Sequence, residues 1–235
     1  MLAGVSVDYY SRLEQGRERN PSPSVLNALA GALNLDTDLR AHVFRLAGLA
    51  PMPWKADSDT VEDSLLELLE SWSHTPALII TQSLDILACN GLAAALYSGF
   101  RASDNLVRMT FLDPSGRGFF TDWERAAETC VANLRLALGY SGMQDRAREI
   151  VAEAYEASPE FRALWNRHSV RGKTHESKAF RHPAVGDLLL TYNAFDVRSS
   201  PGLQLIVYQA PAGTPSADKL QLLGSLAASA EPMPR

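Results

Sequence analysis

Two cysteines in 235 residues are too few for a disulfide framework or a cysteine-based zinc site. We therefore expect Cys89 and Cys130 to be reduced, buried side chains of a cytoplasmic protein. No apolar run approaches the roughly 18 residues that a membrane-spanning helix needs. The first eight residues contain neither the basic nor the apolar segment of a secretion signal. No membrane partner is predicted.

Motifs of the common enzyme classes are also missing. The chain has no Gly-x-Ser-x-Gly elbow, phosphate-binding loop or dinucleotide fingerprint. His168, His175 and His182 do not have the spacing of metal ligands. Asp122 and Glu124 lie two apart on a predicted helix, so their side chains diverge and form no catalytic pair. We predict no catalytic residue, no metal site and no resident cofactor.

An excess of positive charge, which DNA-binding modules usually carry, is absent as well. The net charge is −5, and residues 1–50 contain five basic and five acidic side chains. The remaining residues contain 17 basic and 22 acidic ones, which account for the whole deficit. An acidic second part is a poor ligand for DNA. Its charge suits a sensory or dimerising role.

What the N-terminal sequence does contain is the second half of a helix-turn-helix. Gly4 suits the turn, Ser6 is a good N-cap for a helix that runs to about residue 15, and Gly16 is a suitable C-terminal stop. In such a motif this helix enters the major groove of DNA. We expect the preceding scaffold and positioning helices to be missing, either by real loss or through a misassigned start.

Two further helices are predicted before residue 50. Ser22 and Pro23 begin the first, and Asp36 caps the second, which ends at Gly48. Their apolar side chains are spaced for burial on one face of each helix: Val25, Leu26, Leu29, Ala30 and Leu33 in the first, and Leu39, Val43, Phe44 and Leu46 in the second. A stretch without periodicity follows, so we divide the chain into a domain at 1–50, a linker at 51–60 and a domain at 61–230.

The second domain mixes strands with helices. Apolar and β-branched runs predict strands at 77–81, 86–89, 177–182, 187–195 and 204–209. Helices are expected at about 60–72, 90–97, 105–111, 121–138, 145–155, 159–168 and 216–227. The fold class is therefore α+β: an all-α helix-turn-helix remnant followed by a PAS-like domain, in which helices cover a five-stranded antiparallel sheet.

Several blocks of sequence occur together in the order typical of one family. They are 2–10, 12–17 and 20–23 in the first domain, and 105–114, 122–124, 158–165 and 182–186, with His168, in the second. In these blocks the chain resembles the MmyB-like transcriptional regulators of the XRE type. The resemblance implies a repressor-like DNA-binding domain followed by a PAS-like domain that binds an apolar, fatty-acid-like molecule.

The repressor pattern assigns roles to side chains of the first helix. Val7, Asp8 and Arg12 are placed toward the bases, and Ser6, Tyr9 and Arg17 toward the sugar–phosphate backbone. Arg12 is the best candidate base reader, because a guanidinium can bind O6 and N7 of guanine with two hydrogen bonds. Asp8 could accept a hydrogen bond from cytosine, or only favour the helix dipole. Glu14 is expected to pair with a nearby arginine on the helix surface.

In the second domain four side chains are candidate ligand contacts: Arg108, Trp123, Trp165 and His168. Both tryptophans are also natural core residues, because each buries a large apolar area. Arg108 stands in an apolar stretch and needs a partner when buried. That partner could be Asp113, Asp122 or the carboxylate of a ligand, and an internal ion pair needs no ligand.

These observations lead to one functional hypothesis and one alternative. The hypothesis is a cytoplasmic, homodimeric transcriptional regulator that binds double-stranded DNA and whose DNA binding responds to an apolar ligand. In the alternative, the chain is a ligand-binding or dimerising sensor that has lost DNA binding with its N-terminal helices. Exposure of the apolar face of the helix that carries Val25, Leu29 and Leu33 would then destabilise the first domain or drive its dimerisation.

Overall fold

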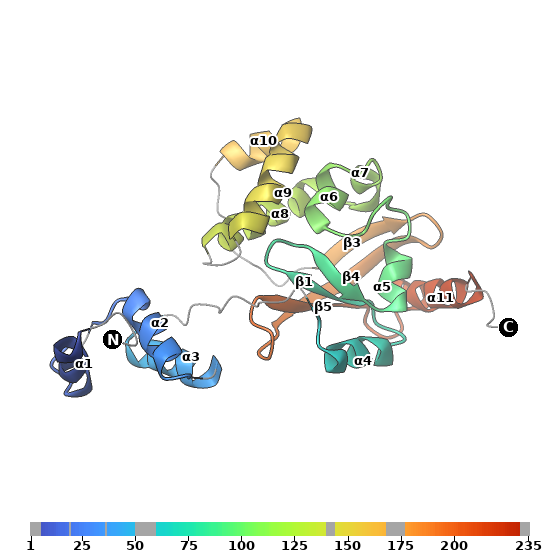
Figure 1. The fold of residues 1–235 in the computed structure, drawn as a ribbon. Coiled ribbons are helices and arrows are strands. Elements are labelled where there is room, and N and C mark those ends of the chain that lie inside the picture. Colours follow the sequence, from blue (N-terminus) through green and yellow to red (C-terminus); the bar gives the residue numbers. More distant parts are fainter. Residues whose placement is uncertain are drawn as a thin grey trace. The chain divides into compact units, whose positions relative to one another are not determined.

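The fold is that of a computed structural model, which describes residues 6–18, 20–35, 37–49, 60–139, 144–167 and 177–230. By its internal contacts the chain divides into two compact units, Met1–Trp54 and Lys55–Arg235. The predicted linker at 51–60 falls almost entirely outside the described residues. Each unit has its own buried side chains and its own architecture, coloured by sequence in Figure 1.

The first unit consists of three short helices. They are α1 (Val7–Glu14), α2 (Pro23–Ala32) and α3 (Thr37–Leu46). The predicted caps are confirmed: the Ser6 side chain accepts a hydrogen bond from the backbone of Tyr9, and Ser22 accepts one from Val25. After α1 the backbone of Gly16 has φ +67°, a left-handed conformation that favours glycine. The predicted cap Asp36 lies outside the described residues.

The described core of the first unit is small. Leu26 and Ala30 of α2 and Phe44 of α3 are buried, as their periodicity predicted. The prediction was wrong for Leu33, Leu39 and Leu46, whose exposures are 55%, 51% and 74%. These leucines lie near the ends of α2 and α3, where the described part of the unit offers no helix to cover them. Periodicity predicts which side chains lie on the same face of a helix, but not whether another element packs against that face.

A five-stranded antiparallel sheet forms the centre of the second unit, with strand order β2-β1-β5-β4-β3. The strands are β1 (Ala77–Thr81), β2 (Ile86–Cys89), β3 (Ser177–His182), β4 (Gly186–Asp196) and β5 (Leu203–Gln209). Each predicted strand is confirmed to within one residue at its ends. In the register, Ile79 pairs with Ala88 of β2 and Leu205 of β5. The first hairpin and the last strand therefore meet at the middle of the sheet.

Both faces of the sheet are packed, which explains the continuous apolar sequence of β1. Alternate residues of a strand point to opposite faces. Leu78 and Ile80 join the main core with helix side chains, whereas Ala77 and Ile79 join a second core with the helix α4 (Asp63–Ser71). All five residues of β1 are buried. Figure 1 shows α4 on one side of the sheet and α6 to α10 on the other.

The remaining helices of the second unit largely follow the predictions. They are α5 (Gly91–Leu96), α6 (Leu106–Phe111), α7 (Gly116–Phe119), α8 (Trp123–Gly139), α9 (Gln144–Ala157), α10 (Pro159–Asn166) and α11 (Pro215–Ala230). Helix α7 was not predicted, because four residues are too few for a periodic pattern. Cys130 is buried as expected, but Cys89, at the end of the edge strand β2, is exposed. No helix among the described residues is long and apolar enough to cross a membrane.

Candidate functional site

Helix α1 presents an ion pair on its exposed surface. The guanidinium of Arg12 donates a hydrogen bond to the carboxylate of Asp8, one helical turn earlier. The two side chains are 55% and 76% exposed, so solvent screens their attraction. Of the predicted base-reading set, these two are therefore neighbours and accessible. The side chain of the third, Val7, lies outside the described residues.

The structure shows contacts within the protein for residues assigned to the sugar–phosphate backbone of DNA. Ser6 caps α1, and its hydroxyl oxygen is 3.2 Å from the Tyr9 backbone nitrogen. Arg17 is exposed after the helix, where its backbone N–H donates to the Arg12 carbonyl at 2.9 Å. The expected arginine partner of Glu14 was wrong: the Tyr10 hydroxyl donates to this carboxylate at 2.7 Å. This hydrogen bond is the main reason why the pKa of Tyr10 is raised.

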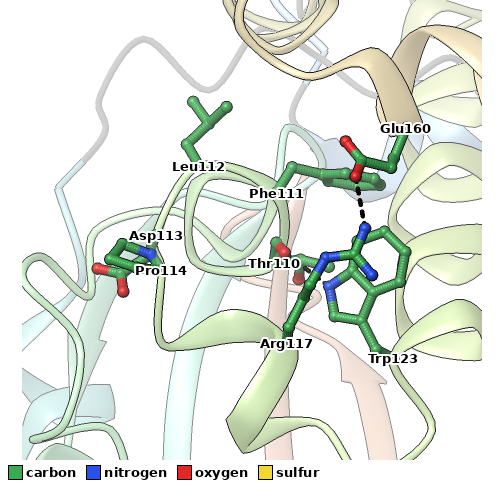
Figure 2. Close-up of a pocket in the computed structure, with 8 residues that line it drawn as sticks. All are labelled: Thr110, Phe111, Leu112, Asp113, Pro114, Arg117, Trp123 and Glu160. Carbon is green, nitrogen blue, oxygen red and sulfur yellow. Dashed lines mark hydrogen bonds and ion pairs between the residues drawn. The ribbon is translucent and has the colours of Figure 1, made fainter.

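In the second unit a cavity of about 230 Å³ opens between the end of α6, α7, α8 and α10. We call it the Trp123 pocket; its lining is drawn in Figure 2. The aromatic and charged members of this lining come from four separate elements. The full set is Thr110, Phe111, Leu112, Asp113, Pro114, Arg117, Trp123 and Glu160.

Gly116 allows α7 to approach α6 closely and so places Arg117 over the pocket. A Cβ atom at this position would lie 2.3 Å from the carbonyl oxygen of Met109 and 2.8 Å from that of Thr110. Both contacts are with backbone, which cannot move aside as a flexible side chain can. The sequence therefore needs glycine at the start of α7 for Arg117, one residue later, to face Trp123.

A turn stabilised by Asp113 leads into α7. Its two carboxylate oxygens accept hydrogen bonds from the backbone of Ser115 and of Arg101, each at 2.8 Å. Partial burial opposes ionisation of this carboxyl group, but these hydrogen bonds outweigh it and lower the pKa of Asp113. The Asp113 carboxylate is therefore ionised at neutral pH.

Trp123 forms one wall of the pocket. Its indole N–H donates to the Thr110 carbonyl at 2.9 Å, and Phe111 meets its ring edge-on with centroids 5.6 Å apart. The Arg117 guanidinium lies 4.2 Å from the ring centroid, a cation–π distance, and also pairs with Glu160 at 2.5 Å. In Figure 2 the guanidinium stands between the indole and the carboxylate.

The carboxylate of Glu160 is stabilised in its charged form. Glu160 lies in the first turn of α10, after the N-cap Ser158. A hydrogen bond from its own backbone N–H, together with that from Arg117, lowers the pKa of Glu160. Beside Trp123 the pocket therefore carries the negative charge of Glu160, which is paired with the positive charge of Arg117.

Arg108 and Trp165, two of the other predicted ligand contacts, do not line this pocket. Arg108 forms an internal ion pair, but with Asp104 at 2.5 Å and Glu153 at 2.8 Å, so the expected partners Asp113 and Asp122 were wrong. Asp104 precedes α6 and Glu153 lies on α9, a helix 45 residues away in sequence whose placement the sequence did not indicate. The hydrogen bonds to Glu153 are the main reason why the pKa of Arg108 is raised.

Trp165 lies on α10 and packs as a core residue. Its ring stacks on that of Phe161 at 5.5 Å, and the guanidinium of Arg135 lies 5.2 Å from its centroid. His168, the remaining predicted contact, falls outside the described residues. Of the four predicted ligand contacts, Trp123 lines the pocket named after it.

A second, larger hollow lies beside α11. This α11 groove has a volume of about 610 Å³, within the range of small-molecule sites, whereas the Trp123 pocket is smaller than most. Its lining combines apolar and polar side chains from the middle of β4, the end of β5 and the residues after it, the loop before β1, and α11. They are His74, Thr75, Thr191, Gln209, Ala210, Pro211, Ala212, Ala217, Leu220 and Gln221.

Sequence reasoning missed Arg117 and Glu160 as pocket residues. The sequence does indicate that Glu160 begins a helix, because Ser158 and Pro159 are a good N-cap and first residue. No local pattern links it to Arg117, which is 43 positions earlier in a helix of four residues. Only the tertiary packing of α7 against α8 and α10 brings the two charges together.

Comparison with known families gives one match in each unit of the chain. The model of the MmyB-like transcription regulator ligand binding domain matches residues 61–223, and that of a helix-turn-helix domain matches residues 1–43. A comparison with curated proteins finds no match. The two matches define a class, the transcription regulators that sense a ligand. Within it, this chain belongs to the MmyB-like regulators, since the ligand-binding match covers more than half of its length.

Proposed function

We propose that the protein is a cytoplasmic, homodimeric, XRE-type regulator, not an enzyme, that reads DNA through α1. The observation that carries this proposal is the exposed Asp8–Arg12 pair on the helix that a helix-turn-helix presents to the major groove. An exposed ion pair is weak, so Arg12 can exchange Asp8 for O6 and N7 of a guanine at little cost. Ser6, Tyr9 and Arg17 then contact the phosphate backbone, and Val7 faces the bases.

Selection from a pool of duplexes with a randomised centre, followed by titration of the enriched duplex, tests this proposal. We expect Arg12→Gln to raise the Kd of that duplex about tenfold, the typical effect of losing one bidentate guanine contact. Arg148→Gln is the matched control, because Arg148 is an exposed arginine on α9. Its Kd should equal that of the wild type.

The salt dependence of binding distinguishes this proposal from the alternative, a sensor that has lost DNA binding. A regulator that contacts several phosphates loses affinity steeply as salt rises, whereas a sensor without DNA binding shows weak, flat binding. A flat response, or equal effects of Arg12→Gln and Arg148→Gln, would contradict the proposed DNA-binding role.

We further propose that an apolar, fatty-acid-like molecule binds in the α11 groove. The size of the groove and its apolar members Ala210, Pro211, Ala217 and Leu220 support this choice over the smaller, charged Trp123 pocket. The polar groups of His74, Thr75 and Gln209 could orient a carboxylate or carbonyl at its end.

Filling the groove should abolish this binding. We expect long-chain fatty acids to raise the melting temperature of the wild type, and Ala217→Phe to remove the shift because the larger side chain occupies the groove. Ala228→Phe is the control, since Ala228 is exposed further along α11. An unchanged shift in Ala217→Phe would place the apolar ligand elsewhere.

A further inference from the structure

In the Trp123 pocket the guanidinium of Arg117 lies on the face of an aromatic ring, where the cation of a ligand would bind. The Arg117 guanidinium lies 4.2 Å from the centroid of the Trp123 ring and is paired with Glu160. The arginine side chain is 60% exposed, so it is not fixed by burial. An exposed arginine can rotate away from an aromatic face with little loss of packing.

The surroundings of this guanidinium favour positive charge. Glu160 contributes a carboxylate to the lining, and Phe111 and Trp123 contribute aromatic rings. The carboxylate of Asp113 accepts hydrogen bonds from backbone N–H groups and points away from Trp123 (Figure 2). When Arg117 rotates outward, the carboxylate of Glu160 and the face of Trp123 remain beside a cavity of about 230 Å³. Carboxylates combined with aromatic rings are the usual protein environment of organic cations.

We propose that the Trp123 pocket binds a small organic cation, an alkylammonium or guanidinium compound, which displaces Arg117 from the face of Trp123. Glu160 pairs with the ligand cation, and the aromatic walls contact the carbon atoms of the ligand. This site is distinct from the α11 groove, and it depends neither on the proposed DNA binding nor on the proposed apolar ligand.

Binding would also change a link between helices. The Arg117–Glu160 ion pair joins α7 to α10 across 43 residues of sequence. A ligand cation that pairs with Glu160 breaks the Arg117–Glu160 ion pair and replaces it with its own contacts. The site therefore couples occupancy to the attachment of α10, which packs on α8 and α9.

Isothermal titration of the full chain at low ionic strength tests the proposal, with agmatine as the cationic probe and hexanoate as an anionic one. We expect agmatine to bind and hexanoate not to bind. Glu160→Gln should weaken agmatine binding about threefold or more, because it removes the charged partner. Arg117→Ala should strengthen it about threefold, because the internal competitor for Trp123 is gone.

Arg181→Ala is the matched control, since Arg181 is also an exposed arginine paired with a carboxylate, that of Asp187, but does not line the pocket. Its agmatine affinity should equal that of the wild type. Binding by Arg117→Ala alone would contradict the proposal, because the ligand then does not displace Arg117 from Trp123 in the wild type. Absence of agmatine binding in both proteins overturns it, as does hexanoate binding that Arg117→Ala abolishes.

Discussion

Gly116 stands where α7 passes closest to the backbone of α6. An added Cβ atom would overlap the carbonyl oxygens of Met109 and Thr110, so Gly116→Ala must push the two helices apart. We expect the free energy of unfolding of the second unit to fall by about 1–3 kcal/mol, the usual cost of overpacking. Urea denaturation followed by tryptophan fluorescence measures this change.

Gly118, two residues later on the same short helix, provides the control. A Cβ atom there meets nothing within 4 Å. Gly118→Ala should therefore leave stability unchanged or raise it by up to about 1 kcal/mol, because alanine favours a helix more than glycine does. Equal destabilisation by the two substitutions would mean that the close approach of α7 and α6 does not matter.

Asn90 shows how far a single residue could be predicted. Its role as N-cap of α5 was predicted and is confirmed by a hydrogen bond from the Ala93 backbone at 2.9 Å. The same buried side chain also accepts from Ala77 and donates to the carbonyls of Trp72 and Thr75. The cap is a local pattern and is visible in the sequence, whereas the other three bonds depend on where α4 and β1 lie.

At the scale of elements, the bridge between α7 and α10 is sensitive to acid. The pKa of Glu160 is lowered from its usual 4.5 in the folded protein, so the unfolded chain takes up the proton more readily. The stability that the ionised carboxylate contributes is complete above about pH 4.5. It is lost as the pH falls through the lowered pKa.

We expect the urea midpoint to fall below pH 4.5, and to fall less in Glu160→Gln, which has no carboxylate to protonate. The difference should be no more than about 0.5 kcal/mol, because the Glu160 side chain is 47% exposed and solvent screens its ion pair. Identical pH profiles for the two proteins would show that this pair adds nothing to stability.

The elements themselves were largely readable from the sequence. Strands were predicted because β-branched and aromatic runs are bounded by turn residues, and long helices because their apolar spacing is regular. Helix α7 was not predicted, because its four residues are too few to show a helical period. The pairing of Arg108 with Glu153 was not predicted for a different reason: the two residues are far apart in sequence, and only the packing of α9 beside α6 brings their charges into contact.

At the scale of the whole molecule, a regulator requires that its two units influence each other. If an apolar ligand changes the affinity for DNA by some factor, DNA must change the affinity for that ligand by the same factor. We expect a fatty acid to alter the Kd of the selected duplex, and saturating duplex to alter the Kd of the fatty acid equally. Two parallel titrations measure both factors, and independence of the two ligands would contradict a sensing role.

The order of strands also has a consequence for synthesis of the protein. Strand β5, which lies beside β1 in the middle of the sheet, ends at Gln209, 120 residues after the end of the β1–β2 hairpin. Until that segment leaves the ribosome, the edge of β1 that pairs with β5 has no partner. All five residues of β1 are buried in the finished fold, so this edge belongs to a strand of the core. Such an edge is a site for aggregation. Folding of the ligand-binding unit must therefore wait for nearly the whole chain, and the nascent hairpin is where we expect chaperones to be needed.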